Sequence, residues 1–274
     1  MKLRNMKKSL LFLSLLVTVL SCSAPNKQER PVEKVKDSIR EHSVLSVLWQ
    51  QHAAEYRALC HQAFNMARWN IEIRKELSDK PFAIIADIDE TVLDNSPYNG
   101  MLIIQDIEFD KNDWIEWGKL ESAEAVPGAV AFFNFADSMG IEVFYISNRY
   151  DVQRAETLSN LRKLNLPNAD SNHVFLKTRT SAKQERRDRV LADYEVLMYL
   201  GDNLSDFSSV FDNQNNSKRN ELVEELKASF GSTFIVFPNA MYGDWESRGI
   251  YESNRDWTDQ QRDSIRQAKL VTYK

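Results

Sequence analysis

The chain has 274 residues, of which 43% are hydrophobic and 11% are aromatic, with only 8 glycines and 7 prolines. This composition excludes collagen-like and low-complexity proteins and predicts a packed globule with a large core. The formal net charge is -5. The first 21 residues contain four basic residues and no acidic one, so their removal leaves 31 basic against 40 acidic residues, a net charge of about -9. We expect a chain this negative to be a poor binder of nucleic-acid polymers through phosphate neutralisation, because that mode of binding needs a basic face.

The N-terminus has the pattern of an export signal. Four basic residues within the first eight precede an apolar run from Leu10 to Leu20, which is too short to span a membrane but typical of a signal peptide. We therefore expect residues 1–21 to be a signal peptide. The segment from Val19 to Cys22 resembles a bacterial lipobox, in which the cysteine is acylated and anchors the protein to a membrane without spanning it. The resemblance implies an exported bacterial lipoprotein, and we predict that it lies in the outer membrane. The alternative is a simple signal peptide that happens to be followed by a cysteine.

The segment that follows is predicted to be a tether. Residues 22–37 are polar and contain Pro25 and Pro31, which suits a flexible connection between lipid and globule. The folded domain is expected over residues 38–274. Between residues 38 and 77 apolar side chains recur at helical spacing without glycine or proline, which predicts two long helices. We interpret Cys60, in the second of them, as a small buried hydrophobic residue.

Four apolar runs with polar ends predict a parallel sheet. They are Phe82–Ala86, Glu142–Ile146, Val196–Leu200 and Thr233–Phe237. Near-continuous apolar runs are typical of strands that are buried on both faces. Helical patterns separate them at Ala129–Ser138, Val152–Lys163 and Ser181–Tyr194. The alternation predicts an α/β fold with a doubly wound, Rossmann-like parallel sheet, whose ligands bind beyond the carboxyl ends of the strands.

The interval from about 96 to 126 is too long for a bare loop between the first two predicted strands. It contains two tryptophans and several charged residues. We therefore expect a helical cap that covers the strand ends.

Two carboxylates follow the first predicted strand. Asp87 and Asp89 are two residues apart, so their side chains lie on the same side of an extended chain and can converge on one substrate atom. Mutual repulsion favours the protonated form of one and leaves the other as the anion. An ionised aspartate can attack phosphorus, and a protonated one can give its proton to the departing alkoxide.

The later polar clusters supply the complementary groups. Asp202 could join Asp87 in holding Mg²⁺, a hard ion that prefers oxygen ligands. Ser147 and Asn148 follow another strand and can bind phosphate oxygens, and Lys183 supplies positive charge for the reacting centre. Each cluster alone is more often a turn, a cap or a solvated residue. Their shared position at strand ends and helix starts is what favours a site.

These clusters resemble the motifs of the haloacid dehalogenase (HAD) superfamily of phosphotransferases. More closely, DIDETVLDNSPY from Asp87 to Tyr98, the Ser147–Arg149 segment, Lys183 and the GDNLSDF segment from Gly201 to Phe207 resemble the class C acid phosphatases, or lipoprotein e family of 5′-nucleotidases. The similarity runs from about Trp49 to the C-terminus. It implies a HAD-like fold and a membrane-anchored, Mg²⁺-dependent phosphatase that hydrolyses phosphomonoesters, above all nucleoside 5′-monophosphates.

The resemblance also implies a role for each motif residue. Asp87 would be the nucleophile of an aspartyl-phosphate mechanism, and Asp89 the general acid, which also gives Mg²⁺ its main-chain carbonyl. Asp202 would be a metal ligand, and Asp206 would support the metal shell. Ser147 and Lys183 would bind phosphate. Glu90 and Thr91 are expected to orient the loop rather than to react.

Aromatic residues are candidates for stacking on the nucleotide base, as members of the resembled family do. Phe109 and Trp114 in the cap and Tyr242 after the last strand are the candidates, with Tyr242 the first choice; packing in the core is the equal alternative for each. Two other functions stay open: a lipoprotein that binds ligands without turnover, and a phosphotransferase that uses an alcohol acceptor. The sequence also leaves homodimerisation open.

Overall fold

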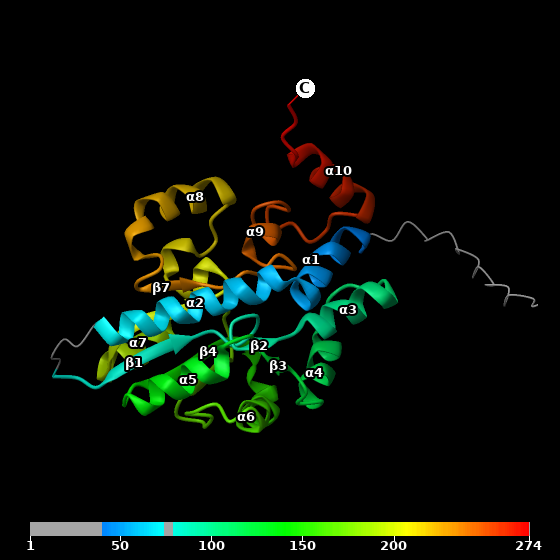
Figure 1. The fold of residues 1–274 in the computed structure, drawn as a ribbon. Coiled ribbons are helices and arrows are strands. Elements are labelled where there is room, and N and C mark those ends of the chain that lie inside the picture. The colour runs from blue at the N-terminus through cyan, green and yellow to red at the C-terminus, as the bar shows by residue number, and fades with distance from the viewer. Residues whose placement is uncertain (1–39, 74–78, 274) are drawn as a thin grey trace, which may run out of the picture. The chain divides into compact units, whose positions relative to one another are not determined.

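The computed structural model describes residues 40–73 and 79–273 (Figure 1). The predicted signal peptide, the acylation site Cys22 and the tether lie outside the described residues. Within the described part, no helix combines the length and the hydropathy that crossing a membrane requires.

Two helices open the described chain, as the periodicity predicts. Helix α1 covers Glu41–His52 and α2 covers Ala54–Ile73, with an extended residue between them. Helix α2 buries one stripe at helical spacing, formed by Tyr56, Cys60, Phe64, Ala67 and Ile71. Cys60 is completely buried and its thiol is free, so the prediction of a buried core residue is confirmed.

The central sheet has five strands in the order β5-β4-β1-β6-β7, and every neighbouring pair is parallel. The strands are β1 (Phe82–Ala86), β4 (Glu142–Tyr150), β5 (Val174–Lys177), β6 (Glu195–Gly201) and β7 (Phe234–Val236). This confirms the predicted α/β fold with a parallel sheet. Strand β5 was missing from the prediction, and β4 extends beyond its predicted end at Ile146 to Tyr150.

Helices cover both faces of the sheet because alternate residues of each strand point to opposite faces. On one face Ile84 and Ala86 of β1 belong to the main core, with α2, α5 (Ala129–Ser138) and α6 (Arg154–Lys163). On the other face Ala83 and Ile85 pack in a separate cluster with Val190 of α7 (Gln184–Asp193). The sheet is therefore a buried middle layer, and its carboxyl-end edge is left to carry polar groups.

The interval predicted as a cap contains two helices. Helices α3 (Ser96–Gln105) and α4 (Lys111–Lys119) lie between the short antiparallel strands β2 (Leu93–Asp94) and β3 (Glu124–Ala125). The cap has an apolar cluster of its own, formed by Tyr98, Leu102 and Trp114. The C-terminal part adds α8 (Asn216–Glu225), α9 (Asp244–Ser247) and α10 (Asp259–Lys269).

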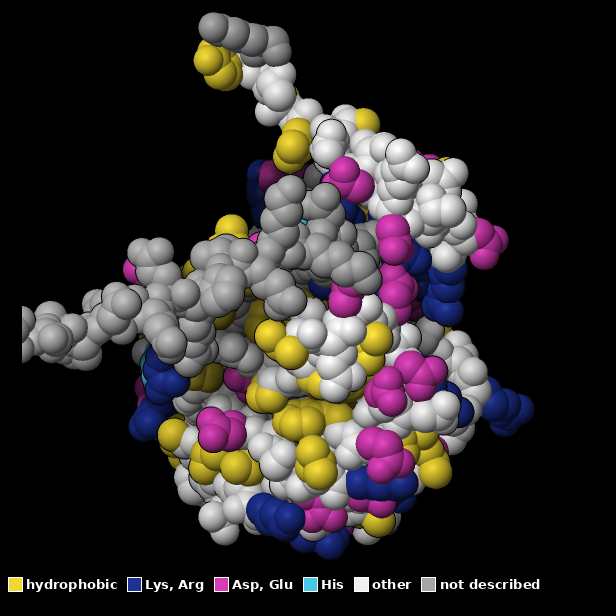
Figure 2. All heavy atoms as spheres, turned by 90° about the vertical axis from the view of Figure 1, so that its right-hand side faces the viewer, with side chains coloured by type: hydrophobic (Ala, Val, Ile, Leu, Met, Phe, Trp, Pro, Cys, Tyr) yellow, Lys and Arg dark blue, Asp and Glu magenta, His cyan; other side chains and the backbone are white. Residues whose placement is uncertain are grey.

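One side of the molecule carries both signs of charge. On the face shown in Figure 2, hydrophobic side chains gather near the middle of the view, and acidic and basic side chains are intermixed around them. Ile104 of α3 and Leu45 of α1 are among the exposed hydrophobic residues of the chain. This face therefore lacks the continuous basic surface on which duplex binding depends.

Candidate active site

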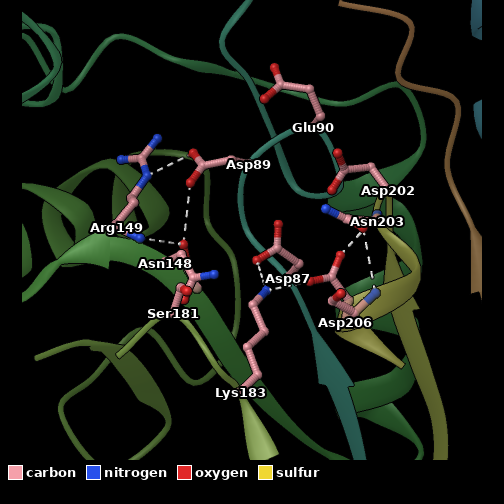
Figure 3. Close-up of polar contacts among 12 residues, drawn as sticks. Asp87, Asp89, Glu90, Asn148, Arg149, Ser181, Lys183, Asp202, Asn203 and Asp206 are labelled. Carbon is pink, nitrogen blue, oxygen red and sulfur yellow. Dashed lines mark hydrogen bonds and ion pairs between the residues drawn. The ribbon is translucent and has the colours of Figure 1, made fainter. Parts of the chain in front are cut away.

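The loop after β1 turns sharply and separates the two aspartates. The carbonyl of Ile88 accepts hydrogen bonds from the N–H groups of Val92 and Leu93, both at 2.8 Å. Glu90 takes a left-handed conformation with φ 59°, so the chain does not stay extended. Asp87 faces Lys183, whereas Asp89 points toward Arg149 (Figure 3). Both aspartates line one cavity, but each has its own set of partners.

Asp87 is almost completely buried and forms an ion pair with Lys183. Burial raises the pKa of Asp87 to about 7; Lys183 acts in the opposite direction, and the charges of Asp206 and Asp89 add to the rise. Lys183 immediately precedes α7 and also pairs with Asp206 at 2.6 Å. Burial opposes its charge, but the two carboxylates outweigh burial and raise the pKa of Lys183. One ammonium group is thus shared between two carboxylates.

A third carboxylate completes an acidic cluster. Carboxylate oxygens of Asp87, Asp202 and Asp206 lie within 4.8 Å of one another. Burial raises the pKa of Asp202 well above its usual range, and the charges of Asp206 and Asp87 act in the same direction. Asp202 also accepts a hydrogen bond from Asn239 Nδ2 at 2.8 Å.

The cluster fits a hard divalent cation. Three carboxylates face one buried ammonium, and unbalanced charges of one sign are costly in a low-dielectric interior. Oxygen donors at this spacing are the ligands that Mg²⁺ prefers. The resemblance implies that Asp89 gives Mg²⁺ only its main-chain carbonyl, and its carboxylate lies on other partners. The resemblance assigns Asp206 only to the support of the metal shell, whereas the structure brings the carboxylate of Asp206 into the cluster.

The position of Asp206 depends on a short helical turn. In the 3₁₀ turn Leu204–Asp206, Asp206 Oδ2 accepts a hydrogen bond from the N–H of Asn203 at 3.0 Å. A Cβ atom on Gly201 would lie 2.5 Å from Asp206 Oδ2, so only glycine allows this approach. Arg187 fixes the same turn, because its guanidinium donates to the carbonyls of Ser205 and Asp206, both at 2.9 Å.

Asp89 is held by one basic and two neutral donors. Its Oδ1 accepts from Arg149 Nε at 2.8 Å, and its Oδ2 accepts from the hydroxyl of Ser147 at 3.2 Å. Asn95 Nδ2 donates to the same carboxylate at 2.9 Å. Arg149 is buried and also lies over the ring of Trp114, with 5.5 Å between its guanidinium carbon and the ring centroid. Three donors therefore fix the position of the Asp89 side chain.

Ser147 and Asn148 lie within β4 rather than after it. The Ser147 hydroxyl is completely buried on Asp89 and is absent from the described lining of the cavity. Asn148 is exposed and lines the cavity, and its Oδ1 accepts from Arg186 Nη2 at 2.8 Å. Thr91 is buried, and its hydroxyl has no hydrogen-bond partner among the described residues. Thr91 thus orients the loop by packing alone.

The three aromatic candidates all line the cavity, yet in different environments. Tyr242 is half-buried, and its hydroxyl donates to Glu90. Burial raises the pKa of Glu90 to about 8, with Asp89 adding to the rise and Tyr242 opposing it. Trp114 packs in the cap cluster, whereas Phe109 is 56% exposed and only flanks that cluster. Tyr242 and Phe109 therefore have accessible ring surface, and Trp114 serves chiefly as a packing residue.

The cavity has a volume of about 810 Å³ and joins groups of opposite sign. Its acidic end contains Asp87, Asp89, Asp202 and Asp206, together with Lys183. Its remaining wall includes residues of α1, α3, α4, the ends of β4 and β5, and the segment after β7. Such a volume holds a substrate considerably larger than inorganic phosphate.

Sequence reasoning missed Arg149, Asn95 and the pair of Glu90 with Tyr242 as parts of the site. Arg149 directly follows the predicted Ser147–Asn148 pair, and this position in the sequence could have indicated that Arg149 belongs to the site. Asn95 donates to Asp89 and Glu90 and accepts from Trp117 Nε1 at 2.9 Å. Only the fold reveals these contacts, because the partners of Arg149 and Tyr242 are 60 and 152 residues away in the chain.

Comparison with known proteins gives a consistent result. Residues 3–245 match the model of the HAD superfamily, subfamily IIIB (acid phosphatase). The class C acid phosphatase of Bacillus anthracis, also solved with tungstate bound, superposes with a TM-score of 0.83 at 35% sequence identity, over 86% of this chain and 100% of that chain.

Two plant proteins are more distant relatives. Acid phosphatase 1 of Solanum lycopersicum is 32% identical over 136 residues, which are 44% of this chain and 50% of that protein. The stem 31 kDa glycoprotein of Glycine max is 27% identical over 184 residues, 65% of this chain and 67% of that protein. The match thus spans about half the length of the tomato protein.

Proposed function

Because the chain belongs to the acid phosphatases of HAD subfamily IIIB, a family of phosphomonoesterases, we propose that it hydrolyses phosphomonoesters through an aspartyl-phosphate on Asp87. The observation that carries this proposal is the position of Asp87. It lies in the cavity between a buried ammonium and two further carboxylates, separate from Asp89 and its donors. A tungstate complex of the Bacillus anthracis relative is in accord with an oxyanion site in this fold.

In the first half-reaction a carboxylate oxygen of Asp87 attacks phosphorus. The Asp87 O–P bond forms, the ester P–O bond breaks, and the departing alkoxide takes a proton from Asp89. Asp89 enters this step in its protonated form. Its partners Arg149 and Ser147 hold the Asp89 side chain at the cavity wall.

In the second half-reaction water attacks the same phosphorus. Asp89, now ionised, accepts a proton from the water while the Asp87 O–P bond breaks, which releases phosphate and restores both residues. The three donors on Asp89 keep its side chain in place for this step. An aspartate at this position therefore favours hydrolysis over persistence of the aspartyl-phosphate.

Positive charge in the site comes from the chain and from a cation. We propose that Asp87, Asp202 and Asp206 hold Mg²⁺, with the main-chain carbonyl of Asp89 as a further ligand. The bound ion would screen the carboxylates and polarise a phosphoryl oxygen. Lys183 contributes fixed charge beside Asp87, and Asn148 offers an amide on the cavity wall. The Ser147 hydroxyl could contact phosphate only by turning away from Asp89.

Nucleoside 5′-monophosphates are the proposed substrates. The 810 Å³ cavity has room for a nucleoside, and Phe109 and Tyr242 present ring surface along its wall. Stacking tolerates any base, which suits an enzyme with broad nucleotide specificity.

The proposed location rests on the sequence alone. We propose that residues 1–21 are removed, that Cys22 is acylated, and that the enzyme is an exported lipoprotein of the outer membrane. The substitution Cys22→Ser should release the protein into the soluble fraction with unchanged turnover. A Cys22→Ser protein that stays in the membrane fraction would argue against acylation.

Substitution of the nucleophile tests the activity. Asp87→Asn keeps the shape of the side chain but removes its nucleophilic charge, so hydrolysis of p-nitrophenyl phosphate should fall by at least ~10³-fold. Asp193→Asn at the exposed end of α7 is the matched control and should retain full activity. Activity in Asp87→Asn equal to that of the control would refute the proposal.

A further inference from the structure

A cluster of basic residues lies at the carboxyl ends of β4 and β5, away from the acidic cluster. Lys177, the last residue of β5, is registered opposite Tyr150, the last residue of β4. The ammonium of Lys177 is 4.0 Å from the centroid of the Tyr150 ring, and that of Lys111 is 4.8 Å from the same centroid. Tyr150, Lys177 and Arg255 line the same cavity as Asp87.

The charges of this cluster are not balanced by carboxylates. Among the described residues, no acidic side chain lies within ion-pair distance of Lys111, Lys177 or Arg255. Other arginines of the cavity wall do have such partners: Arg248 pairs with Asp244 at 2.9 Å and Arg266 pairs with Asp263 at 3.2 Å.

Repulsion within the cluster is visible at Lys177. Burial lowers the pKa of Lys177, and the positive charges of Arg186, Lys111 and Arg255 lower it further. Attraction to the face of the Tyr150 ring accounts for where the two ammonium groups lie, but it leaves the positive charges uncompensated. A bound anion would compensate them.

The basic cluster is connected to the reacting end of the cavity. Asn148 and Tyr150 are two residues apart on β4 and both line the cavity. The guanidinium of Arg186 donates to Asn148 Oδ1 and adds its charge between the two ends. A substrate that places one phosphate at Asp87 would therefore extend along positive potential toward Lys177.

We propose that Lys177 and Arg255, which line the cavity, form a second anion subsite that binds a second phosphate group of the substrate, and that Lys111, beside the Tyr150 ring, adds positive charge to it. The substrate class is a phosphomonoester that carries a second phosphate, such as a nucleoside bisphosphate. This inference rests on the proposed function for the site of hydrolysis, but it adds a specificity that the acidic cluster alone does not provide.

Paired substrates test the subsite in the full-length enzyme with Mg²⁺. The measured quantity is the ratio of kcat/KM for adenosine 3′,5′-bisphosphate to kcat/KM for adenosine 5′-monophosphate. Lys177→Ala should lower this ratio about fivefold, because the partly exposed ion pair between Lys177 and the second phosphate is lost. Lys177→Glu should lower it more than tenfold, because attraction is replaced by repulsion between two negative charges. Lys227→Glu makes the same charge change at a lysine that is 75% exposed and outside the cavity wall, and it should leave the ratio unchanged.

A binding measurement separates this inference from the proposed function. Titration calorimetry of Asp87→Asn with adenosine 3′,5′-bisphosphate should show weaker binding when Lys177→Glu is added. If Lys177→Glu weakens binding of the bisphosphate but the wild type hydrolyses neither substrate, the subsite is sustained and the proposed phosphatase activity is overturned. Normal hydrolysis with a ratio and an affinity that do not depend on Lys177 would overturn the subsite and leave the phosphatase intact. Thermal unfolding of each variant verifies that it is folded.

Discussion

The two functions of Tyr242 can be separated by two substitutions. Its ring faces the cavity, whereas its hydroxyl donates to the buried carboxyl group of Glu90. Tyr242→Phe removes only the hydroxyl and keeps the ring. Tyr242→Ala removes both. If the ring stacks on a nucleotide base, the two variants should differ in substrate affinity, although both lose the hydrogen bond.

The geometry around Glu90 sets the expected loss of stability. Without the tyrosine, Glu90 still accepts from the N–H of Asn95 at 2.8 Å, from Asn95 Nδ2 at 3.3 Å and from Gln50 Nε2 at 3.5 Å. Because these donors remain, Tyr242→Phe should cost about 1–2 kcal/mol, within the range for one lost buried hydrogen bond. For a domain of this size the Tm should fall by about 2–8 °C.

The assay compares a substrate that has a base with one that has none. Stacking is worth about 1–3 kcal/mol per base, so Tyr242→Ala should raise the KM for adenosine 5′-monophosphate roughly 5- to 150-fold. The KM for glycerol 2-phosphate, which has no ring, should change less than twofold in the same variant. Tyr242→Phe should retain a KM near that of the wild type for both substrates.

Two results would refute this reasoning. An equal rise in KM for both substrates in Tyr242→Ala would show that the ring does not contact a base. A Tyr242→Phe variant as weak in nucleotide binding as Tyr242→Ala would assign the effect to the hydroxyl and Glu90.

Three further predictions concern the metal cluster, Arg149 and Cys60. Asp206→Asn should raise the Mg²⁺ concentration for half-maximal activity by about 10- to 100-fold; an unchanged Mg²⁺ titration would place the ion elsewhere. Arg149→Met should destabilise the protein by about 3 kcal/mol in urea unfolding, the low end for breaking a buried ion pair because Asp89 is 17% exposed. Burial raises the pKa of the Cys60 thiol to about 11 from an ordinary value of 9. The neutral thiol therefore stabilises the fold below pH 9, and on the order of 2 kcal/mol should be lost between pH 9 and 11 relative to Cys60→Ala.

The latter two outcomes have direct checks. Urea midpoints of Arg149→Met equal to those of the wild type would mean that the Asp89 pair contributes nothing to stability. Parallel pH profiles of unfolding for the wild type and Cys60→Ala would contradict the assigned burial effect, since other titrating groups are common to both proteins.

The central strands could be predicted because burial on both faces leaves a clear mark on the sequence. Phe82–Ala86 is apolar throughout, and β1 has these same bounds. Strand β5 could not be found in this way, because it has only four residues at the edge of the sheet and alternates between buried and half-buried. The end of β4 was misplaced since the polar residues from Ser147 to Arg149 resemble a loop although they continue the strand.

The candidate site was predictable in its members but not in their pairing. Asp87, Lys183 and Asp202 were recognised from their positions at strand ends and helix starts, and they do come together. The turn at Glu90 directs Asp89 to Arg149 instead of toward Asp87, and no local pattern indicates that turn. Asp206 enters the cluster through a tight approach to Gly201, which also depends on the folded backbone.

The most direct test of the central claim is chemical trapping of the phosphorylated residue. The substrate is p-nitrophenyl phosphate, whose leaving group departs without a proton from Asp89, so in Asp89→Asn only the second half-reaction should slow, by ~10²–10⁴-fold, and the acyl phosphate should accumulate. Borohydride reduction would convert a phosphorylated aspartate to homoserine, which peptide mass spectrometry locates. The account predicts homoserine at position 87 and only when substrate is present. A burst of released alcohol with Asp87 unmodified would contradict it.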